Sequence, residues 1–425
     1  MIDTPETGGP PSAEERTVHE ESPGGAHEGS LGELFVRPDF VRVWLIGGFA
    51  GSIHWLEILA TAVVVFEITG SPLSVALVMA FRALPLVLFG AVMGDIAERV
   101  SRKLLLIGGF AILIVSSLVL ASLAISGTLQ VWHIALGGFL SGTVFSTEFP
   151  VRRMLLGEYA GVDRIGRAMS LDSVTRNATR VLGPALGGFL LEWIGIQGTY
   201  LLAAAFYMIS VFLAARLQAG PISAIEQGRN VIANVIDGFR YIAANRKIVG
   251  TLMITVVMNV WGFAYISMVP VVGREDLGLS AFPIGLLMSS EGLGALMGAL
   301  AAALISRPAY FSKLYLYGPA LFFVAILLFS LSDWYALSLV VLLIGGVGLA
   351  GFTTMQATLI FLEAAPEVRG RVMGAISVSI GTGPIGILHV GALANWLGAA
   401  NAITIISIEG MIALLITALV WPEVR

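Results

Sequence analysis

Apolar runs of roughly 20 residues recur along this chain from about residue 40 to its C-terminal end. A run of that length forms a helix that crosses the hydrocarbon layer of a membrane. Of the 425 residues, 57% are hydrophobic and 12% are charged, whereas an ordinary soluble domain carries about 25% charged residues. Because a water-soluble domain cannot bury so many hydrophobic residues in its core, the sequence predicts an all-α polytopic membrane protein.

Twelve transmembrane helices with polar connections account for the pattern. Residues 1–38, which precede the first of them, are polar and contain eight acidic side chains, so we expect a disordered acidic cytoplasmic tail there. The predicted spans cover residues 40–67, 73–94, 104–126, 129–151, 167–194, 198–216, 248–273, 282–305, 314–332, 334–360, 372–397 and 401–421.

The distribution of lysine and arginine predicts the orientation. With a cytoplasmic N-terminus, twenty of these residues fall on the cytoplasmic side, whereas only Arg274 falls on the other. This bias is typical of the positive-inside rule. We therefore expect an integral multi-pass protein of a bacterial inner membrane with both termini in the cytoplasm.

The longest inner connection, residues 217–247, lies midway through the membrane part. It divides the chain into two predicted six-helix bundles, residues 39–216 and 248–425, related by pseudo-symmetry. An apolar helical face within the connection predicts a helix at the cytoplasmic interface, while a solvated linker with chance periodicity is the alternative. That face contains Ile232, Val235, Ile236, Phe239 and Ile242.

An internal repeat supports the division into halves. The segment GVDRIGRAMS, from Gly161, aligns with APEVRGRVMG, from Ala365, at a spacing of 204 residues. Two related six-helix halves place a substrate between them near the bilayer midplane and work by rocking one half against the other. Such an architecture is typical of a transporter.

Two motifs resemble the major facilitator superfamily. The segment GDIAERVSRK, residues 94–103, resembles the superfamily's loop between helices 2 and 3, with Ser101 in place of the usual glycine. The segment GPALGG, residues 183–188, resembles the helix 5 motif of its antiporters. The segments RPDFVRVWLIGGFAGSI and NVIDGFRYIAANRKI resemble the branch that contains the enterobactin exporter and macrolide efflux proteins. The resemblance covers about residues 32–421 and implies alternating access.

The loop between helices 2 and 3 is our candidate gate. Its charges can contact neighbouring helix ends only when the cytoplasmic side is closed, which biases a two-state equilibrium. The alternative is that its bases merely follow the positive-inside rule. The candidate gating residues are Gly94, Glu98, Arg99, Arg102 and Lys103.

Ionisable residues inside the spans are candidates for function, because charge is costly in hydrocarbon. His54 and Glu57 share one face of the first helix. Arg82 in the second helix is the obvious partner for Glu57, and Glu291 lies at a comparable depth in the opposite half. We consider Glu57, His54 and Glu291 as proton-coupling residues; a structural ion pair for Glu57 and a packing role for His54 are the alternatives. We assign His389 to a hydrogen bond between packed helices.

The fifth span carries a polar stripe. Asp172, Arg176 and Arg180 follow one another at one-turn intervals and should face the cavity, where they would attract an anionic or polar ligand. The alternative pairs the arginines with Asp172 and Glu57. Beyond the stripe, Gly183 and Pro184 predict a bend, and the glycines that follow allow a neighbouring helix to approach closely. Those glycines are Gly187 and Gly188.

These features predict a proton-coupled exporter of a small organic molecule such as a siderophore, a drug or a similar metabolite. An uptake permease, a lysolipid-type carrier and a non-transporting scaffold or sensor are the alternatives. No P-loop, HExxH, GxSxG or cysteine occurs, so we expect neither ATP use nor an intramembrane enzyme. We expect no cofactor, metal or nucleic acid; the partners are a small-molecule substrate, protons and the lipid bilayer, and the chain should act as a monomer.

Overall fold

The computed structural model describes residues 31–218, 241–305, 310–365 and 368–425, and every regular element in these ranges is helical. Ten of the described helices are long and apolar enough to cross a membrane. The fold is therefore that of an all-α polytopic membrane protein. The predicted total of twelve spans stays a prediction, since α5 and α6 carry too many polar residues to be counted among the ten.

We call residues 31–218 the N-terminal half and residues 241–425 the C-terminal half. The short helix α1 lies within the segment predicted as a tail, and its Leu34 is fully buried. The rest of that tail, and the predicted amphipathic face from Ile232 to Phe239, lie outside the described residues. The helices of the N-terminal half are α1 (Leu31–Phe35), α2 (Pro38–Thr69), α3 (Pro72–Arg99), α4 (Arg102–Ile125), α5 (Val131–Ala160), α6 (Ile165–Trp193) and α7 (Ile196–Ala215).

Two of the predicted spans of the C-terminal half are interrupted. The π-helical turn η2 (Met258–Gly262) and the 3₁₀ turn η3 (Phe263–Ser267) separate α9 from α10, and Gly381–Thr382 separate α14 from α15. Such departures inside a helix are frequent at functional sites. The helices of this half are α9 (Arg246–Val257), α10 (Val269–Glu275), α11 (Ala281–Ile305), α12 (Phe311–Ser330), α13 (Tyr335–Glu363), α14 (Arg369–Ile380), α15 (Gly383–Leu397) and α16 (Ala399–Val420).

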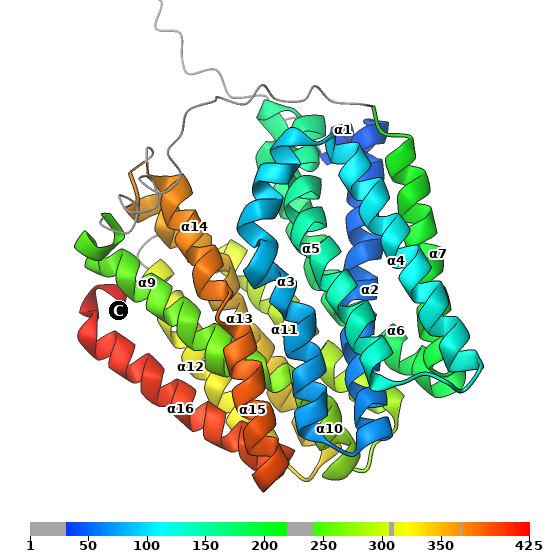
Figure 1. The fold of residues 1–425 in the computed structure, drawn as a ribbon. Helices are drawn as coiled ribbons and strands as arrows, with labels where there is room; N and C mark the ends of the chain where they lie inside the picture. Colours follow the sequence, from blue (N-terminus) through cyan, green and yellow to red (C-terminus); the bar gives the residue numbers. More distant parts are fainter. Residues whose placement is uncertain (1–30, 219–240, 306–309, 366–367) are drawn as a thin grey trace, which may run out of the picture.

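Short connections make successive helices antiparallel and give the bundle two distinct ends (Figure 1). At the end of α2, Gly70 adopts a φ of 59°, which glycine tolerates best, and its N–H donates to the carbonyl of Phe66. We name the end where α2 starts the basic end and the other the far end. Basic residues at the basic end include Arg42, Arg102, Lys103, Arg164, Arg216, Arg246 and Lys247.

The two halves join at the far end. Glu192 of α6 accepts hydrogen bonds from the Ser280 hydroxyl and the Phe282 amide of the opposite half. Ser71 donates to Asn395 across the same boundary at 3.4 Å, and Glu67 of α2 pairs with Arg274. The far-end parts of α2 and α3 also share one buried apolar core with the C-terminal half.

Glycines allow α6 and α11 to lie against each other at the far end. A Cβ on Gly188 would collide with the carbonyl of Ala281, and a Cβ on Gly285 would collide with that of Pro184. Toward the basic end the helices of the two halves diverge (Figure 1), and Val174 of α6 is 46% exposed there. The structure is thus closed at the far end and splayed at the basic end.

Candidate functional site

Glu57 lies in a polar cluster within the core of the N-terminal half. Its Oε2 accepts hydrogen bonds from Arg82 at 3.0 Å and from Ser141 at 3.1 Å, and its Oε1 accepts one from Tyr207 at 3.3 Å. These groups come from α2, α3, α5 and α7, and both charged residues are 7% exposed. The carboxylate is therefore satisfied by three donors, and the cluster ties four helices together.

His54 lies at the edge of this cluster. Its Nδ1 is 3.4 Å from Nη2 of Arg82, and its ring stacks on Phe145 with centroids 4.5 Å apart. These contacts suit a packing residue, and a role of His54 in proton coupling stays a prediction.

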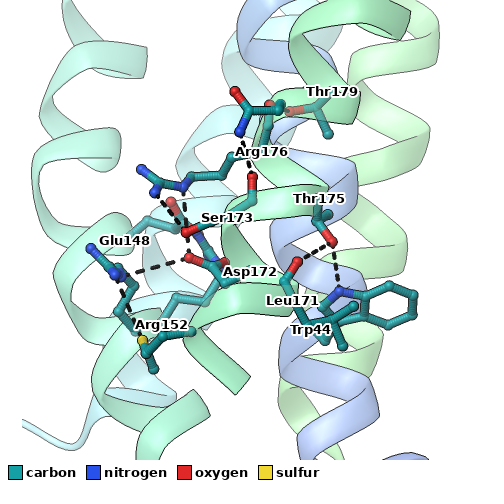
Figure 2. Close-up of polar contacts among 12 residues, drawn as sticks. Trp44, Glu148, Arg152, Leu171, Asp172, Ser173, Thr175, Arg176 and Thr179 are labelled. Carbon is teal, nitrogen blue, oxygen red and sulfur yellow. Dashed lines mark hydrogen bonds and ion pairs between the residues drawn. The ribbon is translucent and has the colours of Figure 1, made fainter. Parts of the chain in front are cut away.

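A second charged cluster joins α5 and α6, and we call it the Arg152 cluster (Figure 2). Arg152 lies between two carboxylates: its Nε donates to Glu148 at 2.6 Å and its Nη1 donates to Asp172. All three side chains are buried. The guanidinium thus holds the two helices together through two charge-assisted hydrogen bonds.

The outer side of the Arg152 cluster carries excess positive charge. Arg153 and Arg176 lie 3.6 and 3.7 Å from the second oxygen of Asp172. These distances are too long for hydrogen bonds, so that buried oxygen has no hydrogen-bond partner. The side chains of these two arginines are 37% and 43% exposed, and both guanidiniums lie over the Phe149 ring. Three arginines against two carboxylates leave one positive charge available to an anionic group.

The predicted stripe on α6 therefore does not face one cavity as a unit. Asp172 is 1% exposed and points toward α5, because Arg152 provides a buried counter-charge that spacing along α6 does not reveal. Arg176 is the exposed member (Figure 2). Arg180 points away to the other half of the protein, toward Glu291 rather than Glu57.

Arg180 and Glu291 form an ion pair between the two halves. The distance from Nη2 of Arg180 in α6 to Oε1 of Glu291 in α11 is 2.6 Å, and their side chains are 12% and 4% exposed. The guanidinium also lies 4.8 Å from the Trp55 ring centroid. Two residues earlier in α11, the Ser289 hydroxyl donates to the Val181 carbonyl at 2.6 Å. The pair lies near the middle of both helices, where a Cβ on Gly292 would still collide with the Arg180 carbonyl.

The motif GPALGG lies in a continuous helix, since α6 runs from Ile165 to Trp193 without interruption. Gly183 packs on the backbone of Ser52 and on Trp55, and Gly187 packs on Leu56. Pro184 is buried between these contacts. The glycines provide the close approach that the sequence predicts, toward α2 on one side and toward α11 on the other; a bending role for Gly183 and Pro184 stays a prediction.

Part of the predicted gate is described. Gly94, Glu98 and Arg99 belong to the end of α3, and their side chains lie outside the described residues. Arg102 pairs with Glu158 of α5, and Lys103 donates to the Leu217 carbonyl at 2.7 Å. Both contacts stay within the N-terminal half. Among the described residues, no group of three or more His, Cys, Asp or Glu side chains could hold a metal ion.

Comparison with protein families decides what kind of protein this is. A family model described as a transmembrane secretion effector, MFS_3, matches residues 34–424. The chain belongs to this family. Its membership confirms the resemblance to the major facilitator superfamily, whose proteins are membrane transporters and not enzymes.

Relatives of this MFS_3 protein include three bacterial transporters. An MFS-type transporter of Bacillus subtilis, YfiS, is 27% identical over 377 residues, which cover 82% of this chain and 85% of that protein. The staphyloferrin A transporter of Staphylococcus aureus is 23% identical over 332 residues, with 77% and 82% covered. The enterobactin exporter EntS of Escherichia coli is 26% identical over 234 residues, or 55% and 56% of the two chains.

Solved transporters share the fold of the MFS_3 chain. A POT family transporter in complex with 5-aminolevulinic acid superposes with a TM-score of 0.75 at 11% identity, covering 91% of this chain and 96% of that one. A bacterial homologue of the human lysosomal transporter Spinster, inward-facing and occupied, gives 0.70 at 13% identity with the same coverage. The fold of a transporter is therefore shown across almost the whole chain.

Several site residues of this MFS_3 protein are not among those predicted from the sequence. Ser141 and Tyr207 contact Glu57 but look like ordinary residues of apolar spans. Arg152 is visible four residues after Glu148, yet nothing in the spacing shows that it is 3% exposed. Glu409 lies in the middle of a span, so the rule that marks Glu57 and Glu291 also marks it.

Proposed function

We propose that this MFS_3 protein is a secondary active exporter, which moves a small organic molecule out of the cell in exchange for protons. The basic end faces the cytoplasm, in agreement with the positive-inside rule, and the protein works as a monomer. The observation that carries the proposal is the ion pair between Arg180 and Glu291, which joins the two halves near the middle of α6 and α11.

The location of this pair suits a switch between two states. Rocking the halves so that the far end opens requires α6 and α11 to separate, and Arg180 then loses Glu291. Breaking a buried ion pair without replacement costs about 3–5 kcal/mol. A ligand that binds either partner offsets this cost and shifts the equilibrium between the two states.

Arg176 supplies a second contact for the same ligand. It lies one turn from Arg180 toward the open end, it is 43% exposed, and it belongs to a cluster with surplus positive charge. A polar or anionic group of the substrate would contact Arg176 first and Arg180 afterwards. Trp55, against which Arg180 packs, offers an apolar surface to the rest of the molecule.

The names of the relatives support the direction and the class of substrate. Two of those named above are a staphyloferrin A transporter and an enterobactin exporter. We therefore propose export, with siderophore-like or drug-like organic molecules as the first compounds to test. Glu57 is held by an arginine and two hydroxyl donors, so we assign its cluster to the stability of the N-terminal half rather than to coupling.

The test uses purified protein in liposomes that contain a pH-sensitive dye, an imposed proton gradient, and a panel of siderophores, macrolides, dyes and lysolipids. We expect one class of compound to trigger proton movement in the direction opposite to that in which the compound moves. Arg180→Ala should raise the substrate concentration needed for half-maximal flux by about tenfold or more, since a hydrogen bond to a charged group contributes about 1.5–3 kcal/mol.

Arg246→Ala is the matched control, because Arg246 forms an exposed ion pair with Glu423 at the basic end. It should leave the flux unchanged. Equal flux in the wild type, Arg180→Ala and Arg246→Ala would exclude the substrate role of Arg180. Flux in the same direction as the protons would indicate an uptake permease.

A further inference from the structure

Three side chains of the C-terminal half meet where α15, α16 and η2 pack together. Oε2 of Glu409 in α16 lies 2.8 Å from Nε2 of His389 in α15 and accepts a hydrogen bond from the Trp261 indole of η2 at 2.9 Å. The side chains of Glu409 and His389 are each 39% exposed. We call these three residues the Glu409 cluster. None of them belongs to the Arg152 cluster or contacts Glu57 or the Arg180–Glu291 pair through the bonds given for those groups.

The Glu409 cluster lies deep in the membrane layer. Glu409 comes ten residues after Ala399 and eleven before Val420, which is about 15 Å of helix on either side. An isolated carboxylate at this depth is costly. Glu57 and Glu291 avoid the cost by pairing with arginines, which stay charged at any physiological pH. Glu409 has instead a histidine, whose charge depends on a proton.

The other titratable groups that the structure describes on the neighbouring helices do not supply Glu409 with a positive charge in place of protonated His389. Among the described residues, those on α3, α9, α10, α12, η3 and the C-terminal residues 422–425 either have partners elsewhere or lie at helix ends or outer surfaces. They are Arg82, which pairs with Glu57; Tyr265, which lies beside Glu291; Tyr315, which donates to Thr251; Glu423, which pairs with Arg246; Arg425, which donates to the Ala418 carbonyl; and Lys247, Arg274, Glu275, Lys313 and Tyr317. His389 is therefore the cationic partner available to Glu409.

The Glu409 cluster includes a residue of one helix interruption and lies near the other. Trp261 belongs to the π-helical turn η2, and His389 lies about two turns into α15, beyond the break after α14. The first turn of α15 packs on η2, since a Cβ on Gly386 would collide with the backbone of Val260. Discontinuous helices that meet near the midplane are typical of ion sites in transporters, and short 3₁₀ or π segments often mark hinges.

We propose that Glu409 and His389 together bind one exchangeable proton in the middle of the C-terminal half. With the proton bound, either as a carboxylic acid beside a neutral imidazole or as a carboxylate beside an imidazolium, the pair is neutral overall. After the proton leaves, the pair carries one negative charge, held by N–H donors of His389 and Trp261. That charge appears beside η2 and α15 and changes the stability of the contact between them. Its coupling to substrate movement rests on the proposed export function, whereas proton binding itself does not.

The direct test measures carboxyl protonation by infrared difference spectroscopy on the full chain in liposomes, titrated from pH 4 to pH 10. The wild type should show a band of the protonated pair, from a carboxylic acid or from an imidazolium, that disappears as pH rises and is missing in Glu409→Gln. In His389→Gln the midpoint should move by about one pH unit or more, since one unit corresponds to about 1.4 kcal/mol of interaction. Glu363→Gln, which removes a carboxylate paired with Lys247 at the basic end, is the matched control and should keep this band and its midpoint.

A second readout keeps the proposal testable if Glu409→Gln fails to fold. Trp261 donates a hydrogen bond to Glu409, so its fluorescence should change with pH at the same midpoint. The contribution of Trp261 is the part of the tryptophan fluorescence that is lost in Trp261→Phe. A band that persists in Glu409→Gln, or a midpoint unaffected by His389→Gln, would overturn the proposal.

Transport measurements separate this inference from the proposed function. If Glu409 titrates as expected and Glu409→Gln stops substrate-driven proton movement, both stand. If Glu409 titrates but no compound drives proton movement, proton binding stands and the export function fails. If export occurs and Glu409 does not titrate, the Glu409 site alone is wrong.

Discussion

Gly285 of α11 lies directly against the carbonyl group of Pro184 in α6, so a Cβ on residue 285 would collide with that oxygen. The contact brings the two halves to backbone distance at the far end. Nearby, Gly188 has the same relationship with Ala281. Far-end closure therefore depends on positions without a side chain, and this makes it accessible to mutation.

Gly285→Leu should separate α6 from α11 and favour a state that is open at the far end. The physical reason is that the new side chain meets backbone rather than a movable side chain. Accessibility of single cysteines near Ser71 to a membrane-impermeant thiol reagent measures the change and should increase. Gly166→Leu, on the partner helix α6, is the control, because a Cβ there meets open space. Equal accessibility in the two variants would contradict the close packing.

A disulfide can lock the far end, and the chain contains no cysteine that would interfere. Ser71 and Asn395 lie in hydrogen-bond contact across the halves, so Ser71→Cys combined with Asn395→Cys should form a bond on oxidation. Transport should stop in the oxidised protein and return after reduction, while either single variant stays active throughout. Undiminished flux in the cross-linked protein would show that the far end does not open during transport.

Arg152 should be essential for stability. Arg152→Ala leaves Glu148 buried without its counter-charge and leaves Asp172 with only the more distant Arg153 and Arg176. Breaking a buried pair in this way costs about 3–5 kcal/mol. Arg153→Ala removes a neighbouring arginine that is 37% exposed, so its effect should stay below about 1 kcal/mol. Thermal unfolding of the purified proteins compares the two. Similar midpoints would show that the Arg152 cluster does not hold α5 to α6.

Glu57 and Arg82 should behave as a coupled structural pair. Glu57→Gln and Arg82→Met should each lower the midpoint of thermal unfolding, because each leaves a buried charge without its partner. The double variant should be more stable than the sum of the single effects implies. Proton-coupled flux through the folded fraction of Glu57→Gln should match that of the wild type. Loss of coupling without loss of stability would instead return Glu57 to a role in proton transfer.

The fold and part of the site follow from local sequence rules. Span lengths and the depth of each charge are properties of the linear sequence, and they bring Arg82 together with Glu57 as expected. They place Arg180 and Glu291 at similar depths but say nothing about their contact, which depends on how α6 and α11 pack.

Other features depend on three-dimensional packing. Asp172 points toward α5 because Arg152 lies there, and spacing on one helix contains no such information. The interruptions at Met258–Ser267 and Gly381–Thr382 lie in strongly apolar segments, where hydropathy is the same for a regular and an irregular helix. Proline gives no warning of the first interruption, since Pro270 comes after it, whereas Pro384 lies two residues beyond Gly381–Thr382 at the start of α15 and does mark the second.

The glycine contacts between α6 and α11 also determine how the two halves separate. Contact between bare backbones is held mainly by dispersion, and a gap of only 0.5–1 Å already removes about a quarter to a half of that attraction. An attraction of such short range gives few stable positions between touching and apart. The far end should therefore open as an abrupt event rather than by gradual widening, and the passage between the halves should spend little time half open.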